Sequence, residues 1–219
     1  MRGLLATFSV HIRILSYNGE ASLPENEAKW LLAARNGNSE AFSRLVDMYS
    51  RPVYSLCYRM LGNPQDAEDA AQEAFLRAFR YLHRYDANRK FATWLLSIAA
   101  NHCIDQHRRV RPVLVALEDA SPVDLRDRRI GPEGRALARE ASDRLQVLLN
   151  ELAPKDRAAM LLYYWYEYSL AEIARELRLS EPALKARMHR ARRSLAQAWL
   201  HSGEAPAFSP RRLYEEAAP

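Results

Sequence analysis

Residues 169–193, "SLAEIARELRLSEPALKARMHRARR", carry the pattern that most restricts how this 219-residue chain folds. Ser169 and Glu172 form an S-x-x-E capping box, which predicts the start of a helix. The apolar residues that follow recur at helical spacing: Leu170, Ile173, Ala174 and Leu177. "RLS" then interrupts the pattern, with Arg178 where such turns favour glycine, and Pro182 falls in the first turn of a second helix. We therefore predict a helix-turn-helix.

The second of these helices has an apolar side and a basic side. On a helical wheel its narrow apolar stripe consists of Leu184, Met188, Ala191 and Leu195. Arg187 and Arg192 flank that stripe. Basic residues around a small alanine can approach a DNA groove and reach phosphates and base edges. The predicted DNA-contacting residues are Pro182, Lys185, Ala186, Arg187, His189, Arg190 and Arg193. The alternative is a solvated helix face whose arginines extend into water.

The rest of the chain also favours helices. Glycine is scarce, at 7 residues, while Leu, Ala, Glu and Arg abound, so we expect an all-α protein. Residues 27–109 read as four consecutive helices. Pro52 marks a kink or a boundary within one of them. The next begins with Asn63 as its N-cap and Pro64 in its first position.

Two helical domains are expected, joined by a flexible linker. Residues 110–135 contain prolines and glycines and show no sustained helical period, which is typical of a linker. The first domain then spans residues 27–109, and the second, which contains the helix-turn-helix, spans residues 136–200. Residues 1–26 form an N-terminal extension and residues 201–219 a C-terminal tail, both without an assigned role.

Composition argues against several other classes of protein. Cys57 and Cys103 lie in apolar helical patterns without C-x-x-C spacing, so neither a disulfide framework nor a structural zinc site is expected. His102 and His107 lie near Cys103 but lack a fourth ligand at usable spacing, and we expect no metal and no cofactor. No segment reaches the roughly 18 apolar residues of a membrane span, and residues 1–22 lack a signal-peptide pattern. We expect a cytoplasmic protein without membrane insertion.

Residues 63–82 predict a helix with two unlike sides. The side expected to face the core carries Ala67, Ala71, Phe75, Ala78, Phe79 and Leu82. The other side carries Asp66, Asp69, Gln72, Glu73 and Leu76. A solvated acidic face is the default interpretation of such charges. However, Asp69 and Glu73 have no evident basic partner at i±4 on the core side, which leaves them available to a binding partner.

The segment that follows interleaves aromatic and basic residues. Its aromatic residues are Tyr85, Phe91 and Trp94, and its polar and basic ones are Arg84, Asn88, Arg89, Lys90, Arg108 and Arg109. An opened nucleic-acid strand needs both kinds, because exposed bases stack on rings and the backbone needs neutralising cations. The formal net charge of +5 also favours an acidic partner. Burial in the core is the alternative for the aromatic residues.

Together the two blocks resemble bacterial sigma factors of the extracytoplasmic-function (ECF) branch. "DAEDAAQEAFLRAF" followed by "KFATWLLSIAANHCIDQHRR" is similar to region two of that family, and "LAPKDRAAMLLYYWYEYSLAEIARELRLSEPALKARMHRARRSL" is similar to its region four. Outside the linker, the resemblance runs from Glu27 to Trp199 in the family's order. It implies a protein that binds core RNA polymerase and directs promoter recognition, strand opening and transcription initiation.

The resemblance also implies roles for particular surfaces. Those that would dock on the β′ clamp helices of the polymerase are Asp66, Asp69, Gln72, Glu73 and Leu76. The loop from Arg84 to Lys90 would capture a flipped base of the downstream (minus-ten) element. The residues that would hold the separated strands are Trp94, Asn101, Arg108 and Arg109. Those that would face the upstream (minus-thirty-five) element are Lys185, Ala186, His189 and Arg190. Region four would also engage the β flap, and an anti-sigma factor is a possible further partner.

Other classes of protein explain less of the sequence. A stand-alone helix-turn-helix regulator would account for residues 169–193 but would leave the first block without a role, and repressors usually bind as symmetric dimers. A helical scaffold would not need a basic recognition face. An enzyme is not expected, because there is no nucleophile with a base, no phosphate loop and no pair of carboxylates in an apolar setting. The promoter sequence and the activating signal are not encoded in any recognisable pattern.

Overall fold

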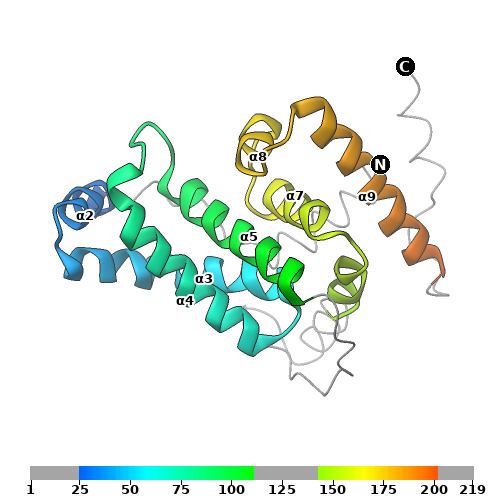
Figure 1. The fold of residues 1–219 in the computed structure, drawn as a ribbon, viewed down its shortest axis with the longest axis horizontal. Helices are drawn as coiled ribbons and strands as arrows, with labels where there is room; N and C mark the ends of the chain where they lie inside the picture. The colour runs from blue at the N-terminus through cyan, green and yellow to red at the C-terminus, as the bar shows by residue number, and fades with distance from the viewer. Residues whose placement is uncertain (1–24, 111–142, 202–219) are drawn as a thin grey trace. The chain divides into compact units, whose positions relative to one another are not determined.

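The computed structural model describes residues 25–110 and 143–201. These residues form helices and turns, with no strand among them, which confirms the all-α prediction (Figure 1). They belong to two compact units, which are described separately: residues 25–110 in one and residues 143–201 in the other. Nearly all of the predicted C-terminal tail, linker and N-terminal extension lies outside the described residues.

The first unit is a block of four helices. Its elements are α2 (Glu25–Arg35), α3 (Ser39–Leu61), α4 (Pro64–Tyr81), the short 3₁₀ helix η1 (Leu82–Arg84) and α5 (Phe91–Val110). Helices α3, α4 and α5 pack against one another, and α2 packs against α3 (Figure 1). Fully buried side chains at the centre include Leu45, Val53, Leu56, Met60, Leu95 and Ala99. The predicted four-helix block is therefore present.

Local signals decide where these helices begin, but Pro52 does not end one. The Asn63 side chain accepts hydrogen bonds from the backbone N–H groups of Gln65 and Asp66, at 2.8 and 3.2 Å, so it caps α4 as predicted. Pro64 is the first residue of α4, where its missing N–H costs nothing. Pro52 is buried inside α3, which continues to Leu61, so the predicted boundary is excluded, and the alternative, a kink within the helix, stays a prediction. A proline inside a helix removes one backbone hydrogen bond. Packing against the neighbouring helices keeps the rest of α3 helical.

Alanine lines the inner side of α4. The buried residues of this helix are Ala67, Ala70, Ala71, Ala74 and Ala78. Such small side chains let the α4 backbone lie close to α3 and α5. Phe79 was predicted on the core side, but its side chain is 44% exposed, and its ring packs against Phe42 with the centroids 4.9 Å apart. The inner face of α4 is thus narrower than the helical wheel predicted.

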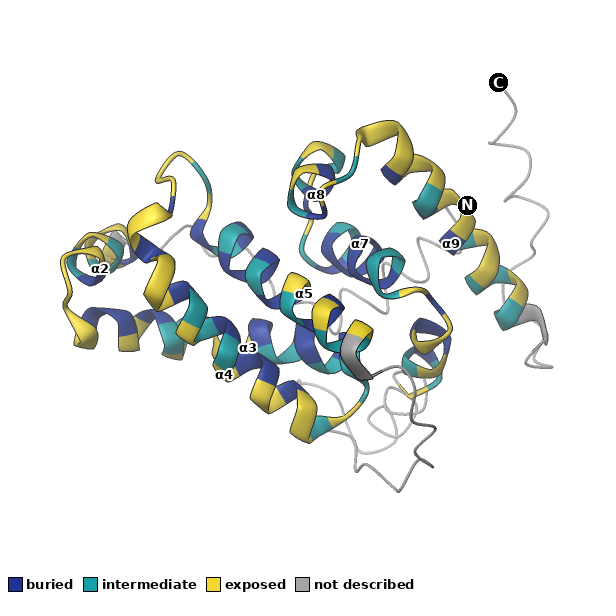
Figure 2. Cartoon of the chain, in the orientation of Figure 1, coloured by how far each residue is buried: buried dark blue, intermediate teal, exposed yellow. Residues whose placement is uncertain are grey.

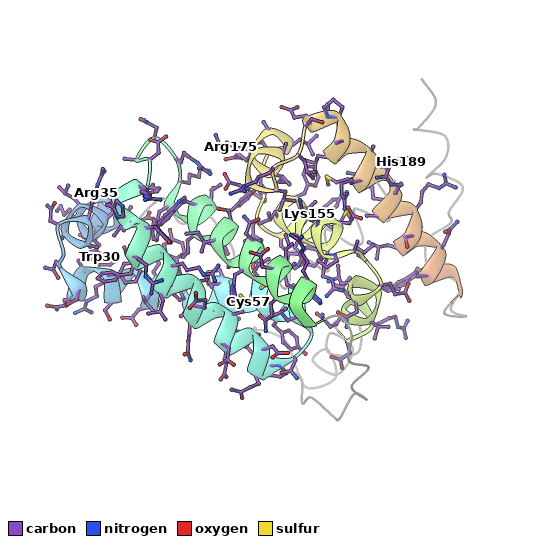
Figure 3. The ribbon with its side chains drawn as sticks, in the orientation of Figure 1. Trp30, Arg35, Cys57, Lys155, Arg175 and His189 are labelled. Atoms are coloured by element: carbon purple, nitrogen blue, oxygen red, sulfur yellow. The ribbon has the colours of Figure 1, made fainter. Side chains whose placement is uncertain are left out.

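The two cysteines lie between α3 and α5. Cys57 and Cys103 are free and buried. Cys57 is labelled in Figure 3. A hydrogen bond with the Cys103 thiol and burial hold the pKa of Cys57 well above its ordinary value. The Nε2 atom of His107 lies 2.7 Å from the Met60 carbonyl oxygen. These side chains contribute to the packing of α5 on α3.

A buried arginine organises the start of the second unit. Residues 143–150 are helical, and α7 (Pro154–Trp165) follows. From α7, the Arg157 Nη2 atom donates to the carbonyl oxygens of Asn150, at 2.8 Å, and Leu152, at 3.4 Å. Burial lowers the pKa of Arg157 to about 10. The guanidinium thereby satisfies carbonyl groups at the end of the preceding helix, where no intrahelical donor remains.

The helix-turn-helix is formed by α8 (Leu170–Glu176) and α9 (Glu181–His201). The capping box is complete: the Glu172 N–H donates to Ser169 Oγ at 3.2 Å, and the Ser169 N–H donates to Glu172 Oε2 at 2.8 Å. Side chains buried between the two helices and α7 include Ile173, Leu177, Leu184, Met188 and Ala191. Arg178 has the left-handed conformation, with φ of +53°, in the turn where glycine is usual. The prediction for residues 169–193 is confirmed.

Candidate functional site

The outer side of α9 is exposed and basic. Its exposed residues include Pro182, Lys185, Ala186, His189, Arg190 and Arg193 (Figure 2). The opposite side is buried, with 0% of Leu184, 1% of Met188 and 3% of Ala191 exposed. Lys185, His189, Arg190 and Arg193 form no hydrogen bond or ion pair with another described residue, and His189 is labelled in Figure 3. This side therefore has cations that folding does not use.

Two other arginines of α9 turn toward α7 instead. Arg187 Nε lies 2.6 Å from Asp156 Oδ1, in an ion pair whose side chains are 30% and 20% exposed. Arg192 Nε donates to the Tyr164 hydroxyl at 3.0 Å, and its guanidinium lies 5.9 Å from the centroid of that ring. Arg187 was predicted to contact DNA, but the structure does not bring it to the outer side of α9. Its predicted role stays a prediction, and its Nε atom already has a partner in Asp156.

Three residues of α7 position the helix-turn-helix, and sequence reasoning missed all of them. They are Lys155, Asp156 and Tyr164. Lys155 Nζ donates to the Leu177 carbonyl oxygen at 3.3 Å, so it contacts the end of α8 (Figure 3). Burial raises the pKa of Tyr164, although the nearby Arg192 opposes that shift. Their partners lie 22 to 31 residues away in the sequence, so no local pattern marks them.

The loop between η1 and α5 holds its aromatic residues inward. Tyr85 is only 8% exposed, and its ring centroid lies 5.5 Å from that of Phe91 and 5.2 Å from that of Trp94. The Tyr85 hydroxyl donates to the carbonyl oxygen of Arg89. Tyr85 was predicted to stack on a base, yet its ring already packs in this cluster. The structure indicates that Tyr85 shapes the loop, and base stacking would require the ring to leave the cluster.

Asp86 also shapes this loop, although it was not among the predicted residues. Its Oδ1 atom accepts hydrogen bonds from the backbone N–H of Asn88, at 3.0 Å, and from Asn88 Nδ2, at 2.9 Å. Aspartate often forms such a turn by accepting a hydrogen bond from the backbone two residues on, so the sequence could have predicted this role. Arg84, Asn88 and Lys90 are exposed around it, and Arg89 is half-buried. The loop thus exposes polar and basic side chains, and its packed aromatic side chains lie beneath them.

On α5, the predicted residues differ in exposure. Asn101 is exposed, and its Nδ2 atom donates to the Ser97 carbonyl oxygen at 2.9 Å. Arg108, further along the same helix, is also exposed, whereas Trp94 is half-buried. The Arg109 side chain lies outside the described residues. The exposed edge of α5 therefore continues from the basic loop.

The outer side of α4 combines acidic groups with an exposed leucine. Asp66, Asp69 and Gln72 are exposed, and Leu76 is 58% exposed. Glu73, predicted to lack a basic partner, is paired with Arg77 Nε at 2.6 Å, so that prediction is wrong. The i to i+4 spacing places Arg77 beside it on the helix. This hydrogen bond lowers the pKa of Glu73. This side of α4 therefore presents exposed carboxylates around one exposed apolar side chain.

Comparisons with known proteins identify the two units. The family model for Sigma-70 region 2 matches residues 45–112, and the model for Sigma-70, region 4 matches residues 142–195. The ECF RNA polymerase sigma factor SigW of Bacillus subtilis is 36% identical over 174 residues, which cover 76% of this chain and 93% of SigW. The chain belongs to the ECF sigma factors.

Further relatives agree with this assignment. The ECF sigma factor SigM of Mycobacterium tuberculosis is 33% identical over 175 residues, covering 78% of this chain and 84% of SigM. The structure of CnrH in complex with the cytosolic domain of CnrY has a TM-score of 0.59 at 26% identity, covering 82% of this ECF sigma factor and all of CnrH. RpoE of Bartonella quintana, with a TM-score of 0.55 at 18% identity, shares the fold.

As an ECF sigma factor, the protein directs promoter-specific transcription initiation. The match to region 2 accounts for the first unit, which a stand-alone helix-turn-helix regulator would leave unexplained. None of the helices in the described parts of this sigma factor has the length and apolar character needed to cross a membrane.

Proposed function

We propose that each of the surfaces described above binds a different partner of a sigma factor. The outer side of α4 docks on the β′ clamp helices through Asp66, Asp69, Gln72, Glu73 and Leu76. The loop from Arg84 to Lys90 binds the downstream element, and the edge of α5 with Asn101 and Arg108 follows the opened strand. The outer side of α9 enters the major groove of the upstream element, and this unit also contacts the β flap.

The observation that carries this proposal is that the basic side chains of α9 fall into two groups, one bound to α7 and one exposed without partners among the described residues. Arg187 and Arg192 are bound to α7, while Lys185, Arg190 and Arg193 lack partners among the described residues. Because folding does not use these exposed cations, they are available to phosphates and base edges. Binding to DNA gives them partners without disturbing the packing of α9 on α7.

Reconstitution with core RNA polymerase tests the proposal. The free protein should bind duplex promoter DNA weakly, because two modest DNA-binding units need a third surface to fix their geometry. Adding core polymerase should produce specific binding, and sequencing the transcripts should reveal a shared upstream and downstream element. Tight, specific binding by the free protein, unchanged by polymerase, would contradict the proposal.

We also propose that an anti-sigma factor covers part of these surfaces. Two similar structures were solved as complexes, CnrH with the cytosolic domain of CnrY and RpoE with the anti-sigma factor NepR. Such a partner would act in the cytoplasm, where polymerase transcribes, and the sigma factor itself would catalyse no reaction. Affinity purification of the full chain from its own cells, followed by mass spectrometry, should recover a protein that competes with core polymerase.

A further inference from the structure

The turn of the helix-turn-helix closes on an arginine with left-handed backbone geometry. At the end of α8, the Arg178 N–H donates to the Arg175 carbonyl oxygen at 3.2 Å, and the Leu179 N–H donates to the Ala174 carbonyl oxygen at 2.8 Å. These two hydrogen bonds define a Schellman motif, in which the residue at the position of Arg178 is most often glycine. The φ angle of Arg178 is +53°.

The same chain places glycine in the same motif elsewhere. At the end of α2, the Gly37 N–H donates to the Ala34 carbonyl oxygen at 3.0 Å, and the Asn38 N–H donates to the Ala33 carbonyl oxygen at 3.1 Å. Gly37 has φ of +91°. Glycine adopts this geometry without a steric penalty, whereas a residue with a Cβ atom is strained there. Arg178 is therefore a less stable choice for this turn than glycine.

The side chain of Arg178 does not compensate for that strain. It is exposed, and its guanidinium forms no hydrogen bond or ion pair with another described residue. In this respect it resembles Lys185 and Arg190, and it differs from Arg187, which is bound to Asp156. A strained residue whose side chain does nothing for the fold suggests a role in binding.

The position of Arg178 indicates what it binds. Helix α9 begins at Glu181, three residues after Arg178, and its exposed basic side follows. In a helix-turn-helix docked on DNA, this end of the recognition helix enters the groove between the phosphate backbones. Glu181 brings a carboxylate to that end, and a carboxylate repels phosphate. A cation in the preceding turn offsets this repulsion.

We propose that Arg178 binds a backbone phosphate at the edge of the upstream element. The contact positions α9 on the DNA and carries no sequence preference of its own. This inference rests on the proposed docking of α9 in the major groove.

Three variants of the full chain, assembled with core polymerase, test it. Arg178→Gly removes both the strain and the cation, and Arg178→Lys retains the cation. Glu167→Gly is the matched control, because Glu167 is also exposed and also left-handed, with φ of +54°, at the other end of α8. The measurements are the melting temperature of each free variant and the affinity of each holoenzyme for an upstream-element duplex over a range of salt.

Opposite effects on stability and binding are expected for Arg178→Gly. Its melting temperature should rise, while its affinity falls by the same factor for all upstream sequences and its salt slope falls by about one ion. Arg178→Lys should keep the wild-type salt slope. Glu167→Gly should raise the melting temperature and leave affinity and slope unchanged.

An unchanged affinity and salt slope in Arg178→Gly would overturn the inference. Arg190→Ala separates that outcome from a failure of the proposed function. If Arg190→Ala weakens upstream binding and Arg178→Gly does not, α9 docks as proposed and only the phosphate contact is wrong. If neither variant changes binding, the docking of α9 is itself wrong.

Discussion

Arg187 on α9 and Asp156 on α7 form an ion pair with 2.6 Å between Nε and Oδ1. The two residues are 31 positions apart in the sequence. Because the pair sits on the flank of the buried stripe, it resists rotation of α9 about its own axis. The direction in which Lys185 and Arg190 project therefore depends in part on a carboxylate of α7.

A double-mutant cycle on this pair should show strong coupling. We expect Asp156→Asn and Arg187→Gln each to destabilise the protein by about 1–3 kcal/mol, because each leaves a partly buried charge without its partner. The double variant should lose less than the sum of the two single losses. Chemical denaturation of the four proteins gives the coupling energy. A coupling energy near zero would show that the pair does not hold α9.

Arg190 and Arg193 should differ in what they contribute to promoter binding. Arg190→Ala should cost about 1–3 kcal/mol and relax the preference at one base position, since the proposed docking of α9 brings this residue to the base edges. Arg193→Ala should weaken binding to every sequence and lower the salt slope by about one ion. Transcription from a panel of upstream-element variants at several salt concentrations measures both effects. If Arg190→Ala changes neither preference nor slope, the basic side of α9 is merely solvated.

Charge reversal on the outer side of α4 should impair assembly with polymerase. The variant Asp69→Lys with Glu73→Lys should bind core polymerase more weakly and keep its helical content, because the Glu73–Arg77 pair that it removes is a solvent-accessible i, i+4 pair, and such pairs contribute little to stability. The matched control reverses Glu40 and Asp47, two exposed acids on α3. Pull-down with core polymerase and circular dichroism provide the measurements. Equal recovery of the α4 variant and the control would exclude this interface.

The ionisation of Glu73 should depend on Arg77. The hydrogen bond from Arg77 lowers the pKa of Glu73, so Arg77→Gln should raise that pKa toward its ordinary value. A lowered pKa means that the pair stabilises the fold above the unfolded-state pKa and that this contribution disappears as the pH falls through the folded-state value. Carbon-detected NMR titration of the Glu73 carboxyl group checks the first point. An unchanged Glu73 pKa in Arg77→Gln would contradict the pairing in solution.

Loosening the loop before α5 should affect strand opening more than polymerase binding. Tyr85→Phe removes the hydroxyl that donates to the Arg89 carbonyl oxygen and should cost about 0.5–1.5 kcal/mol of stability. The ring cluster should remain. Tyr54→Phe is the control, because the buried Tyr54 hydroxyl has no hydrogen-bond partner among the described residues. Permanganate reactivity of promoter thymines should fall for Tyr85→Phe alone, and equal reactivity of both variants would argue against a role for loop shape.

Sequence reasoning succeeded where the signal is local. Asn63 and Ser169 cap helices through neighbours two or three residues away, and both caps were predicted. The stripe with Leu184 was predicted because helical periodicity depends only on spacing. The position of Arg187 beside that stripe was also predicted, but its ion pair with Asp156 was not, because the pair depends on how α7 packs against α9. The burial of Tyr85 was likewise decided by tertiary packing, which composition alone does not reveal.

The two sides of α4 differ in how well they tolerate substitutions, because alanine lines the inner side. At Ala70 and Ala74, both with no exposed surface, any larger side chain would have to force α3 or α5 away. At Asp69 and Gln72, both exposed, many residue types fit, because no described residue packs over these side chains. New specificities for a protein partner can therefore arise on the outer side of α4 by single substitutions, while the inner side keeps the helix in place.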